Sequence, residues 1–167
     1  MATAIFISVN GYSLPPDIGH NSPAVEAVQN YSVLVVDDDP SIRKMVIAAL
    51  KRDAVPYTFA EAGNGRDALD AMRDQIPDVV VLDLMMPLVS GWDVLRERAG
   101  DDDLRKIPVI VVSANRDPEL ATAVQSGICA FLPKPFDIGA LRALVRSCVS
   151  PIVAPVAEHP GQQSLPC

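Results

Sequence analysis

The chain has 167 residues and a mass of 17.9 kDa, which is enough for one ordinary domain and too little for two. Apolar residues make up 49% and charged residues 21% of the chain, so a protein that is disordered throughout is excluded. The formal net charge of -7 disfavours a nucleic-acid or anionic-membrane partner, because such a surface repels phosphate groups.

The two ends of the chain differ in composition from its middle. Residues 1–30 contain no Lys or Arg and therefore lack the positive segment that opens a secretory signal. Prolines are frequent at both ends, so we expect a flexible N-terminal arm over residues 1–30, a core over 31–149 and a flexible Pro-rich tail over 150–167. Three cysteines without a CxxC pair indicate neither a disulfide framework nor a zinc site, and they favour a cytoplasmic protein.

The core alternates short apolar runs with longer helical stretches, which is typical of an α/β fold. The runs are VLVV (33–36), YTFA (57–60), VVVL (79–82), VIVV (109–112) and CAFL (129–132). Four of them are apolar without alternation, as parallel strands covered on both faces require, whereas the second continues into an acid and suits an edge. The pattern predicts an open, doubly wound, five-stranded parallel sheet with helices on both faces.

The helical stretches carry signals for their beginnings and ends. Asp39 is a candidate cap before Pro40, and an apolar face follows at Ile42, Met45, Val46, Ala49 and Leu50. A later helix is expected to begin at Pro118 and to stop at Gly127. The last helix is expected behind Asp137, with an apolar face at Ile138, Leu141, Leu144, Val145 and Cys148.

Polar residues follow four of the predicted strands. Asp37 and Asp38 end the first run, Asp83 the third, Ser113 the fourth, and Lys134 follows the fifth. Because the carboxyl ends of parallel strands meet at one edge, we expect these groups to converge. Three carboxylates at about 5 Å would repel one another by about 10 kcal/mol in total, so protonation, the lysine or a divalent cation must offset the repulsion. An all-oxygen site suits Mg²⁺, and an aspartate beside Mg²⁺, a lysine and a hydroxyl is arranged to attack phosphorus.

Four segments, in order and spacing, resemble the receiver domain of bacterial two-component response regulators. They are VLVVDDDPSIRKM, VVVLDLMMPLVSGW, VIVVSAN and FLPKPF, and the resemblance covers about residues 31–149. It implies that Asp83 is the phosphoacceptor, and that Asp37, Asp38 and Asp83 hold Mg²⁺ together with the backbone carbonyl of Met85. It also implies a flavodoxin-like strand order of 2-1-3-4-5.

The resemblance extends to the groups that respond to phosphorylation. Lys134 would pair with the phosphoryl oxygens, and Ser113 would hydrogen-bond them. Ser113 and Phe131 would act as switch residues, although Phe131 can equally be a packed core aromatic. The Lys134-Pro135 peptide is commonly cis in the family. Met85 and Asn115 stand where the family tunes the loss of the phosphoryl group, and we expect this loss to be slow or moderate.

The function implied is that of a stand-alone response regulator rather than a classical enzyme. The phosphoryl donor would be a histidine kinase or a histidine phosphotransfer protein. A downstream protein would bind the face formed by helix 4, strand 5 and helix 5, or the chain would serve in a phosphorelay. Residues 150–167 contain no Lys or Arg and four prolines, so a DNA-reading helix is not expected there.

Other interpretations of the same residues remain open. Asp39 can serve only as a helix cap, and Ser90, where many receivers carry Asp, can cap the next helix. A Mg²⁺-dependent phosphohydrolase of the haloacid-dehalogenase type would use Asp37 as nucleophile and Asp39 as general acid, but this leaves Asp83 unexplained. A third possibility is a docking module that keeps the receiver fold without using phosphate.

Overall fold

Residues 29–114 and 128–149 are described in the computed structural model of the chain. The strands are β1 (Tyr31–Val36), β2 (Tyr57–Ala62), β3 (Val79–Asp83), β4 (Val109–Ser113) and β5 (Ile128–Pro133). The helices are α1 (Pro40–Leu50), α2 (Gly65–Asp74), α3 (Gly91–Ala99), the 3-10 turn η1 (Leu104–Lys106) and α5 (Ile138–Val149). The predicted helix from Pro118 to Gly127, the tail at 150–167 and all but the last two residues of the predicted N-terminal arm lie outside the described residues.

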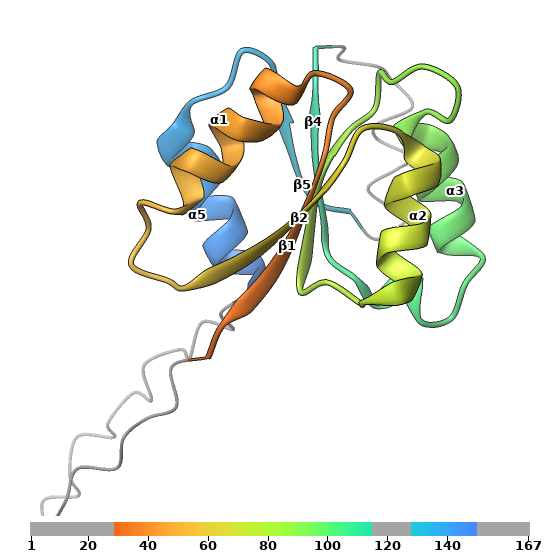
Figure 1. Cartoon of the computed structure of the whole chain (residues 1–167), viewed down its shortest axis with the longest axis horizontal. Helices are drawn as coiled ribbons and strands as arrows, with labels where there is room; N and C mark the ends of the chain where they lie inside the picture. The colour runs from red at the N-terminus through yellow and green to blue at the C-terminus, as the bar shows by residue number, and fades with distance from the viewer. Residues whose placement is uncertain (1–28, 115–127, 150–167) are drawn as a thin grey trace, which may run out of the picture.

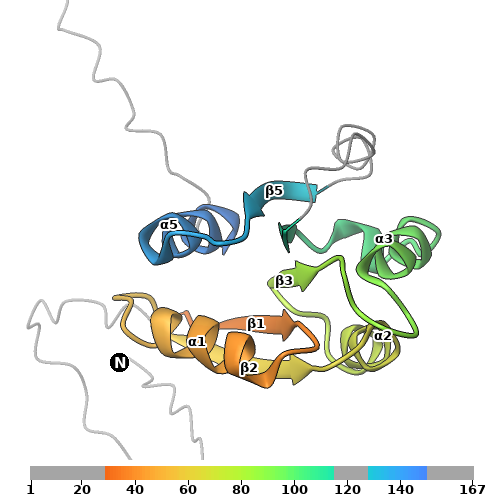
Figure 2. The same ribbon diagram turned by 90° about the horizontal axis from the view of Figure 1, so that it is seen from above.

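The five strands form one parallel sheet in the order β2-β1-β3-β4-β5, as predicted. Helices α1 and α5 cover one face and α2 and α3 cover the other (Figures 1 and 2). Side chains of one strand alternate between the two layers: Val33 and Val35 belong to the core beneath α1 and α5, and Leu34 to the core beneath α2 and α3. Both faces of the central strands are therefore apolar, which explains runs without alternation.

β2 lies at an edge of the sheet, and its burial pattern differs from that of the central strands. Exposed and partly buried residues alternate along most of β2, whereas every residue of β3 and β4 is buried. The acid in YTFAEA, Glu61, is exposed on this strand. The prediction of an edge strand is confirmed, because only an edge strand can leave such a side chain in water.

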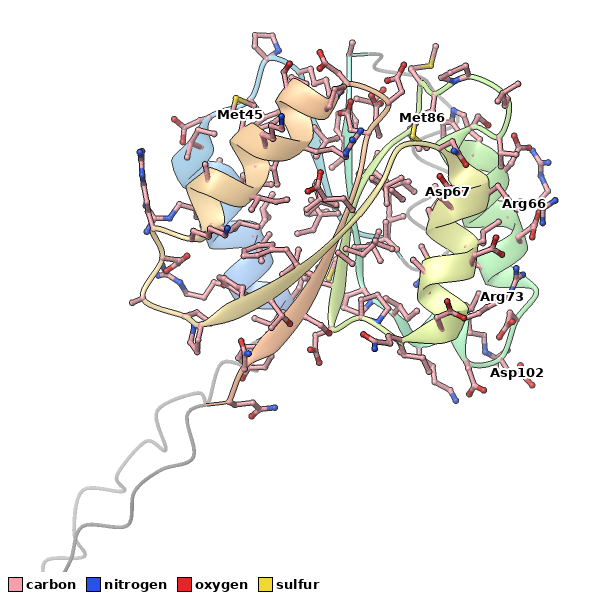
Figure 3. The ribbon with its side chains drawn as sticks, in the orientation of Figure 1. Met45, Arg66, Asp67, Arg73, Met86 and Asp102 are labelled. Atoms are coloured by element: carbon pink, nitrogen blue, oxygen red, sulfur yellow. The ribbon has the colours of Figure 1, made fainter. Side chains whose placement is uncertain are left out.

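α1 begins and packs largely as the sequence indicates. The Asp39 carboxylate accepts a hydrogen bond from the Ser41 amide at 2.7 Å, so its capping role is confirmed. Val46, Ala49 and Leu50 are buried, but Met45 was wrongly placed on the apolar face, because 41% of it is exposed (Figure 3). Successive helical residues turn by about 100°, which puts Met45 roughly that far from Val46 and outside the buried stripe.

The beginnings of α3 and α5 also follow local signals. Ser90 and Asp93 form a capping box, so Ser90 does cap α3. The Asp137 carboxylate accepts a hydrogen bond from the Ala140 amide at 2.8 Å at the beginning of α5. Of the helices in the described part of the chain, none is long and apolar enough to cross a bilayer.

Candidate functional site

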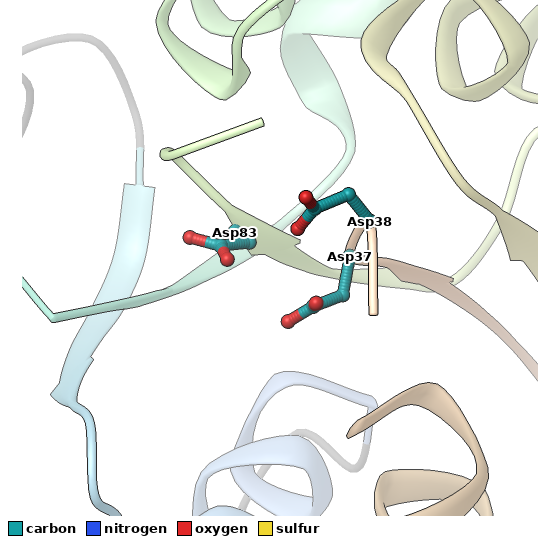
Figure 4. Close-up of side chains that lie close together, drawn as sticks. All are labelled: Asp37, Asp38 and Asp83. Carbon is teal, nitrogen blue, oxygen red and sulfur yellow. The ribbon is translucent and has the colours of Figure 1, made fainter. Parts of the chain in front are cut away.

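Three carboxylates meet at the carboxyl ends of β1 and β3. Asp37 and Asp38 directly follow β1, and Asp83 is the last residue of the neighbouring strand β3. One oxygen from each carboxylate lies within 4.8 Å of the other two, as the close-up in Figure 4 illustrates. Asp37 and Asp83 are 4% and 5% exposed, whereas Asp38 is exposed. The predicted convergence of these side chains is therefore a feature of the fold.

Lys134 joins this cluster from the end of β5. Its ammonium Nζ lies 2.7 Å from Oδ2 of Asp37 and 2.6 Å from Oδ2 of Asp83. Burial by itself lowers the pKa of Lys134, but the hydrogen bonds and charges of Asp37 and Asp83 raise it by more, so the net pKa is raised. Because its pKa is raised above an ordinary lysine value, Lys134 stays positively charged at neutral pH.

The second oxygen of each buried carboxylate is held by the backbone. Oδ1 of Asp37 accepts the Asp39 amide at 2.9 Å, and Oδ1 of Asp83 accepts the Met85 amide at 3.0 Å. Both side chains are thus fixed by a lysine on one oxygen and a peptide N–H on the other. Such hydrogen bonds restrict the rotation of a carboxylate side chain.

The charges of the site leave an excess of negative charge. Two carboxylates at 4.8 Å repel each other by about 3 kcal/mol at an effective dielectric of about 20. Lys134 compensates one of the three negative charges. The atoms that could bind a metal ion here are all carboxylate oxygens, and the Asp38 carboxylate is open to solvent. This arrangement fits a hard divalent cation such as Mg²⁺ that keeps part of its water shell.

Arg43 is a member of the site that the sequence did not single out. Its Nη1 donates to the backbone carbonyl of Asp37 at 2.8 Å, and its Nε donates to Oε2 of Glu61 at 3.0 Å. The side chain is only 18% exposed. The sequence shows only that a basic residue lies on the first turn of α1. The contact of Arg43 with Glu61 on β2 depends on how α1 packs against the sheet.

Gly91 is a second residue whose role becomes visible only in the fold. A Cβ atom at this position would lie 2.2 Å from the carbonyl oxygen of Asp83 and 2.7 Å from the Cα of Leu84. The Gly91 amide also donates to the Leu84 carbonyl at 3.1 Å. The beginning of α3 therefore packs directly on the backbone that carries the Asp83 carboxylate, and only glycine permits this approach.

The remaining predicted residues lie on β4 and β5. Ser113 is fully buried at the end of β4, and its carbonyl accepts the Lys134 amide at 2.9 Å. Phe131 is partly buried against the core beneath α2 and α3. The Lys134-Pro135 peptide is cis, as the resemblance implied. Asn115 lies outside the described residues.

Met85 is 59% exposed next to Asp83, and its main chain is fixed by the hydrogen bond to that carboxylate. Asp39, the general acid of the phosphohydrolase interpretation, is instead used to cap α1. Asp83 belongs to the carboxylate cluster and is held by the Met85 amide and the Lys134 ammonium. The phosphohydrolase interpretation gives Asp83 no role and so does not explain this arrangement.

Comparisons with known proteins assign the chain to a family. The profile of the response regulator receiver domain matches residues 33–146, and the chain belongs to this family. Its members are phosphoacceptors of two-component signalling, phosphorylated on an aspartate. The phosphohydrolase family considered above is therefore not the family of this chain.

Individual relatives agree with this assignment. The DNA-binding response regulator MtrA of Mycolicibacterium smegmatis is 36% identical over 116 residues, a match that covers 69% of this chain and 49% of MtrA. The chain spans 52% of the response regulator Rre1 of Synechocystis and 26% of the DNA-binding transcriptional regulator NtrC of Escherichia coli, so these relatives are longer proteins.

Solved structures show the same fold. The receiver domain of the Francisella response regulator 1452 is 30% identical, with a TM-score of 0.65 and coverage of 72% of this chain and 97% of that one. The receiver domain of the sensor histidine kinase PA1611 from Pseudomonas aeruginosa has a magnesium ion in its active-site cleft. It has a TM-score of 0.64 and covers 72% of this chain and 98% of its own, but at 23% identity it shows the fold alone.

Proposed function

We propose that this chain accepts a phosphoryl group from a phosphohistidine onto Asp83 and signals through the phosphorylated form. The observation that carries the proposal is the meeting of three carboxylates and the Lys134 ammonium at the ends of β1, β3 and β5. A bound Mg²⁺ would neutralise charge on the phosphoryl oxygens. Asp37, Asp38, Asp83 and the backbone carbonyl of Met85 would hold it.

The residues of the chain contribute mainly positioning and charge. A carboxylate oxygen of Asp83 would form the new bond to phosphorus while the bond from phosphorus to the donor imidazole breaks and its electron pair stays on nitrogen. Lys134 already contacts Asp83 at 2.6 Å, so its charge is in place for the phosphoryl oxygens. The chain itself would thus be a phosphoacceptor that assists its own phosphorylation, not a classical enzyme.

Phosphorylation would act on the strands beside the site. Ser113 would hydrogen-bond the phosphoryl group, and Phe131 would change its packing, shifting an equilibrium between two states of the domain. The output surface would be formed by helix 4, strand β5 and helix α5, where helix 4 lies outside the described residues. A downstream protein, or the next member of a phosphorelay, would bind there.

The partners and the organisation of the chain are part of the same proposal. Residues 31–149 contain no histidine, so the phosphohistidine would have to come from a partner. This donor would be a histidine kinase or a histidine phosphotransfer protein. The charge of -7 argues against nucleic-acid and membrane partners, although MtrA is by name a DNA-binding protein. We further propose that the receiver domain spans residues 31–149 and that the protein is cytoplasmic.

A phosphorylation experiment with matched variants tests the proposal. The protein is incubated with acetyl phosphate and Mg²⁺, and the adduct is measured by intact-protein mass spectrometry. We expect a phosphoryl adduct in the wild type and in Asp39→Asn, which keeps a good helix cap, and none in Asp83→Asn or after chelation of Mg²⁺.

Other outcomes would favour the alternatives. An adduct that persists in Asp83→Asn but is lost in Asp37→Asn would point to phosphohydrolase chemistry at the first strand. A folded wild-type protein that takes up no phosphoryl group from acetyl phosphate or from a phosphorylated histidine kinase would favour a docking module that does not use phosphate.

A further inference from the structure

The described residues contain two cysteines, and both are free thiols on neighbouring elements. Cys129 lies on β5 and is exposed, whereas Cys148 lies on α5 and is partly buried. Neither residue belongs to the site around Asp83. Their relative position follows from the way β5 and α5 are arranged.

The fold places the two cysteines at similar distances from the turn that joins β5 to α5. β5 and α5 run in opposite directions, with α5 lying over the sheet face next to β5 (Figures 1 and 2). Cys129 is four residues before the end of β5, or about 13 Å at about 3.3 Å per strand residue. Cys148 is ten residues after the beginning of α5, or about 15 Å at about 1.5 Å per helical residue.

Cys148 and the strand residue that follows Cys129 pack on the same side of the sheet. Cys148 continues the helix face of the buried residues Leu141 and Val145 and packs against the core beneath α1 and α5. On β5 the pairing with β4 is irregular: Ile128 pairs with Val109 and Ala130 with Ile110, so Cys129 is the additional residue of a bulge. Its neighbour Ala130 packs against the same core as Cys148.

The two thiols differ in environment. Burial, followed by the nearby thiol of Cys129, raises the pKa of the Cys148 thiol to about 12, so Cys148 keeps its proton at neutral pH. The exposed Cys129 is therefore the thiol that a reagent from solution reaches first.

We propose that Cys129 and Cys148 form a redox-active pair that hydrogen peroxide, or another peroxide, converts into an intramolecular disulfide. Cys129 would first be oxidised to a sulfenic acid, with one peroxide oxygen added to sulfur and the other released as water. The sulfur of Cys148 would then bond to that of Cys129, and the hydroxyl leaves with the Cys148 proton as a second water. Such reversible disulfides are the kind found in reducing compartments.

The disulfide would lie on the surface from which we propose that the signal leaves the domain. It would tie the beginning of β5 to the last turn of α5, and Cys129 is two residues from Phe131 on the same strand. Oxidation would therefore be a second covalent input to this surface. It needs no phosphoryl chemistry, so its test is independent of the function proposed for Asp83.

The test uses the full chain with the substitution Cys167→Ser, which leaves only the two cysteines of the pair. The reduced protein is treated with a small excess of hydrogen peroxide, the reaction is stopped with catalase, and free thiols are blocked with N-ethylmaleimide in denaturant. Intact-protein mass spectrometry should show loss of both maleimide adducts in a species that stays monomeric on non-reducing gels. Treatment with dithiothreitol should restore both adducts.

Two controls test whether the disulfide requires Cys148 and the folded structure. Cys148→Ser keeps Cys129 and Cys167, and we expect it to form little monomeric disulfide. The Cys167→Ser protein unfolded in urea should form the disulfide more slowly than the folded protein. The proposal is overturned if both adducts persist in the folded protein, if only dimers or sulfinic acid form, or if either control forms a monomeric disulfide as fast.

Discussion

Arg43 connects three parts of the chain around the acidic site. Its guanidinium donates to the carbonyl of Asp37 and to the carboxylate of Glu61, which links α1 to the end of β1 and to β2. Asp37 in turn contacts Lys134 and the Asp39 amide. Arg43 is therefore a positioning residue that acts through the backbone of Asp37.

We expect Arg43→Ala to weaken Mg²⁺ binding about tenfold, because a hydrogen bond from a charged donor contributes about 1.5 kcal/mol. Arg43→Lys should lose less affinity. Isothermal titration calorimetry with Mg²⁺ measures the effect, and Lys44→Ala, at the exposed neighbouring position, is the control. Equal Mg²⁺ affinity in the Arg43→Ala and Lys44→Ala proteins would show that Arg43 does not position the site.

Met85 lies two positions after Asp83, and its side chain is exposed to water. Its thioether offers a water molecule only a weak hydrogen bond. We expect Met85→Asn to shorten the lifetime of the phosphorylated protein about fivefold, since one well-placed hydrogen bond contributes about 1 kcal/mol. The rate of loss of the phosphoryl adduct measures this.

Met45→Asn is the matched control, because Met45 is also an exposed methionine but lies on α1. It should leave the phosphoryl lifetime unchanged. An unchanged lifetime in Met85→Asn as well would mean that the side chain two positions after Asp83 does not limit the access of water.

At the scale of elements, the contact of α3 with the end of β3 is the tightest constraint on the site. Ser90 caps α3, and Gly91 then lies against the carbonyl of Asp83. A side chain at position 91 must displace either the helix or the backbone that carries Asp83. The position of the Asp83 carboxylate thus depends on a residue eight positions later in the chain.

We expect Gly91→Ala to lower the free energy of unfolding by about 2 to 3 kcal/mol and to reduce phosphorylation of Asp83. Urea unfolding and the acetyl phosphate reaction measure the two effects. Gly100→Ala, after the other end of α3, is the control, because a Cβ there would lie 3.6 Å from the nearest atom, the Glu97 carbonyl oxygen. A Gly91→Ala protein as stable as Gly100→Ala would contradict the close contact.

At the scale of the whole molecule, a buried carboxylate joins the α1–β2 connection to α5, away from the Asp83 site. The Asp53 side chain is fully buried and lies 2.5 Å from Nη2 of Arg146 and 3.6 Å from Nε of Arg142. Burial raises the pKa of Asp53, but the hydrogen bonds from Arg146 and the Ala54 amide, with the charges of both arginines, lower it by more. The net pKa is below the ordinary value of 3.8.

Because the pKa of Asp53 is lower in the folded state, this carboxylate stabilises the fold above pH 3.8, and the contribution is lost as the pH falls through the folded value. We expect Asp53→Asn to lower the free energy of unfolding at pH 7 by about 1 to 2 kcal/mol, since both arginines are partly exposed. The difference in unfolding free energy between Asp53→Asn and the wild type should shrink as the pH falls below 3.8. Urea unfolding at pH 7 and at acidic pH measures it.

Asp102→Asn is the control for this prediction, because Asp102 also pairs with an arginine but is 85% exposed (Figure 3). It should change the stability by less than about 0.5 kcal/mol. A similar loss in both variants at pH 7 would mean that the burial of Asp53 does not matter.

The amino-acid sequence by itself determined the strands, their parallel arrangement and the edge position of β2. Apolar runs without alternation require cover on both faces, and this requirement is local to each run. The convergence of Asp37, Asp38 and Asp83 follows as well, because side chains at the carboxyl ends of neighbouring parallel strands must meet.

Only the tertiary structure decided which groups touch. Lys134 and Asp37 are 97 positions apart, and their 2.7 Å contact depends on how all the intervening elements pack. The same holds for the contacts of Arg43 with β2 and of Gly91 with Asp83, and for the exposure of Met45. The physical reason is that periodicity defines the side of an element a residue lies on, whereas distances of a few ångströms arise from the close packing of complete helices against the sheet.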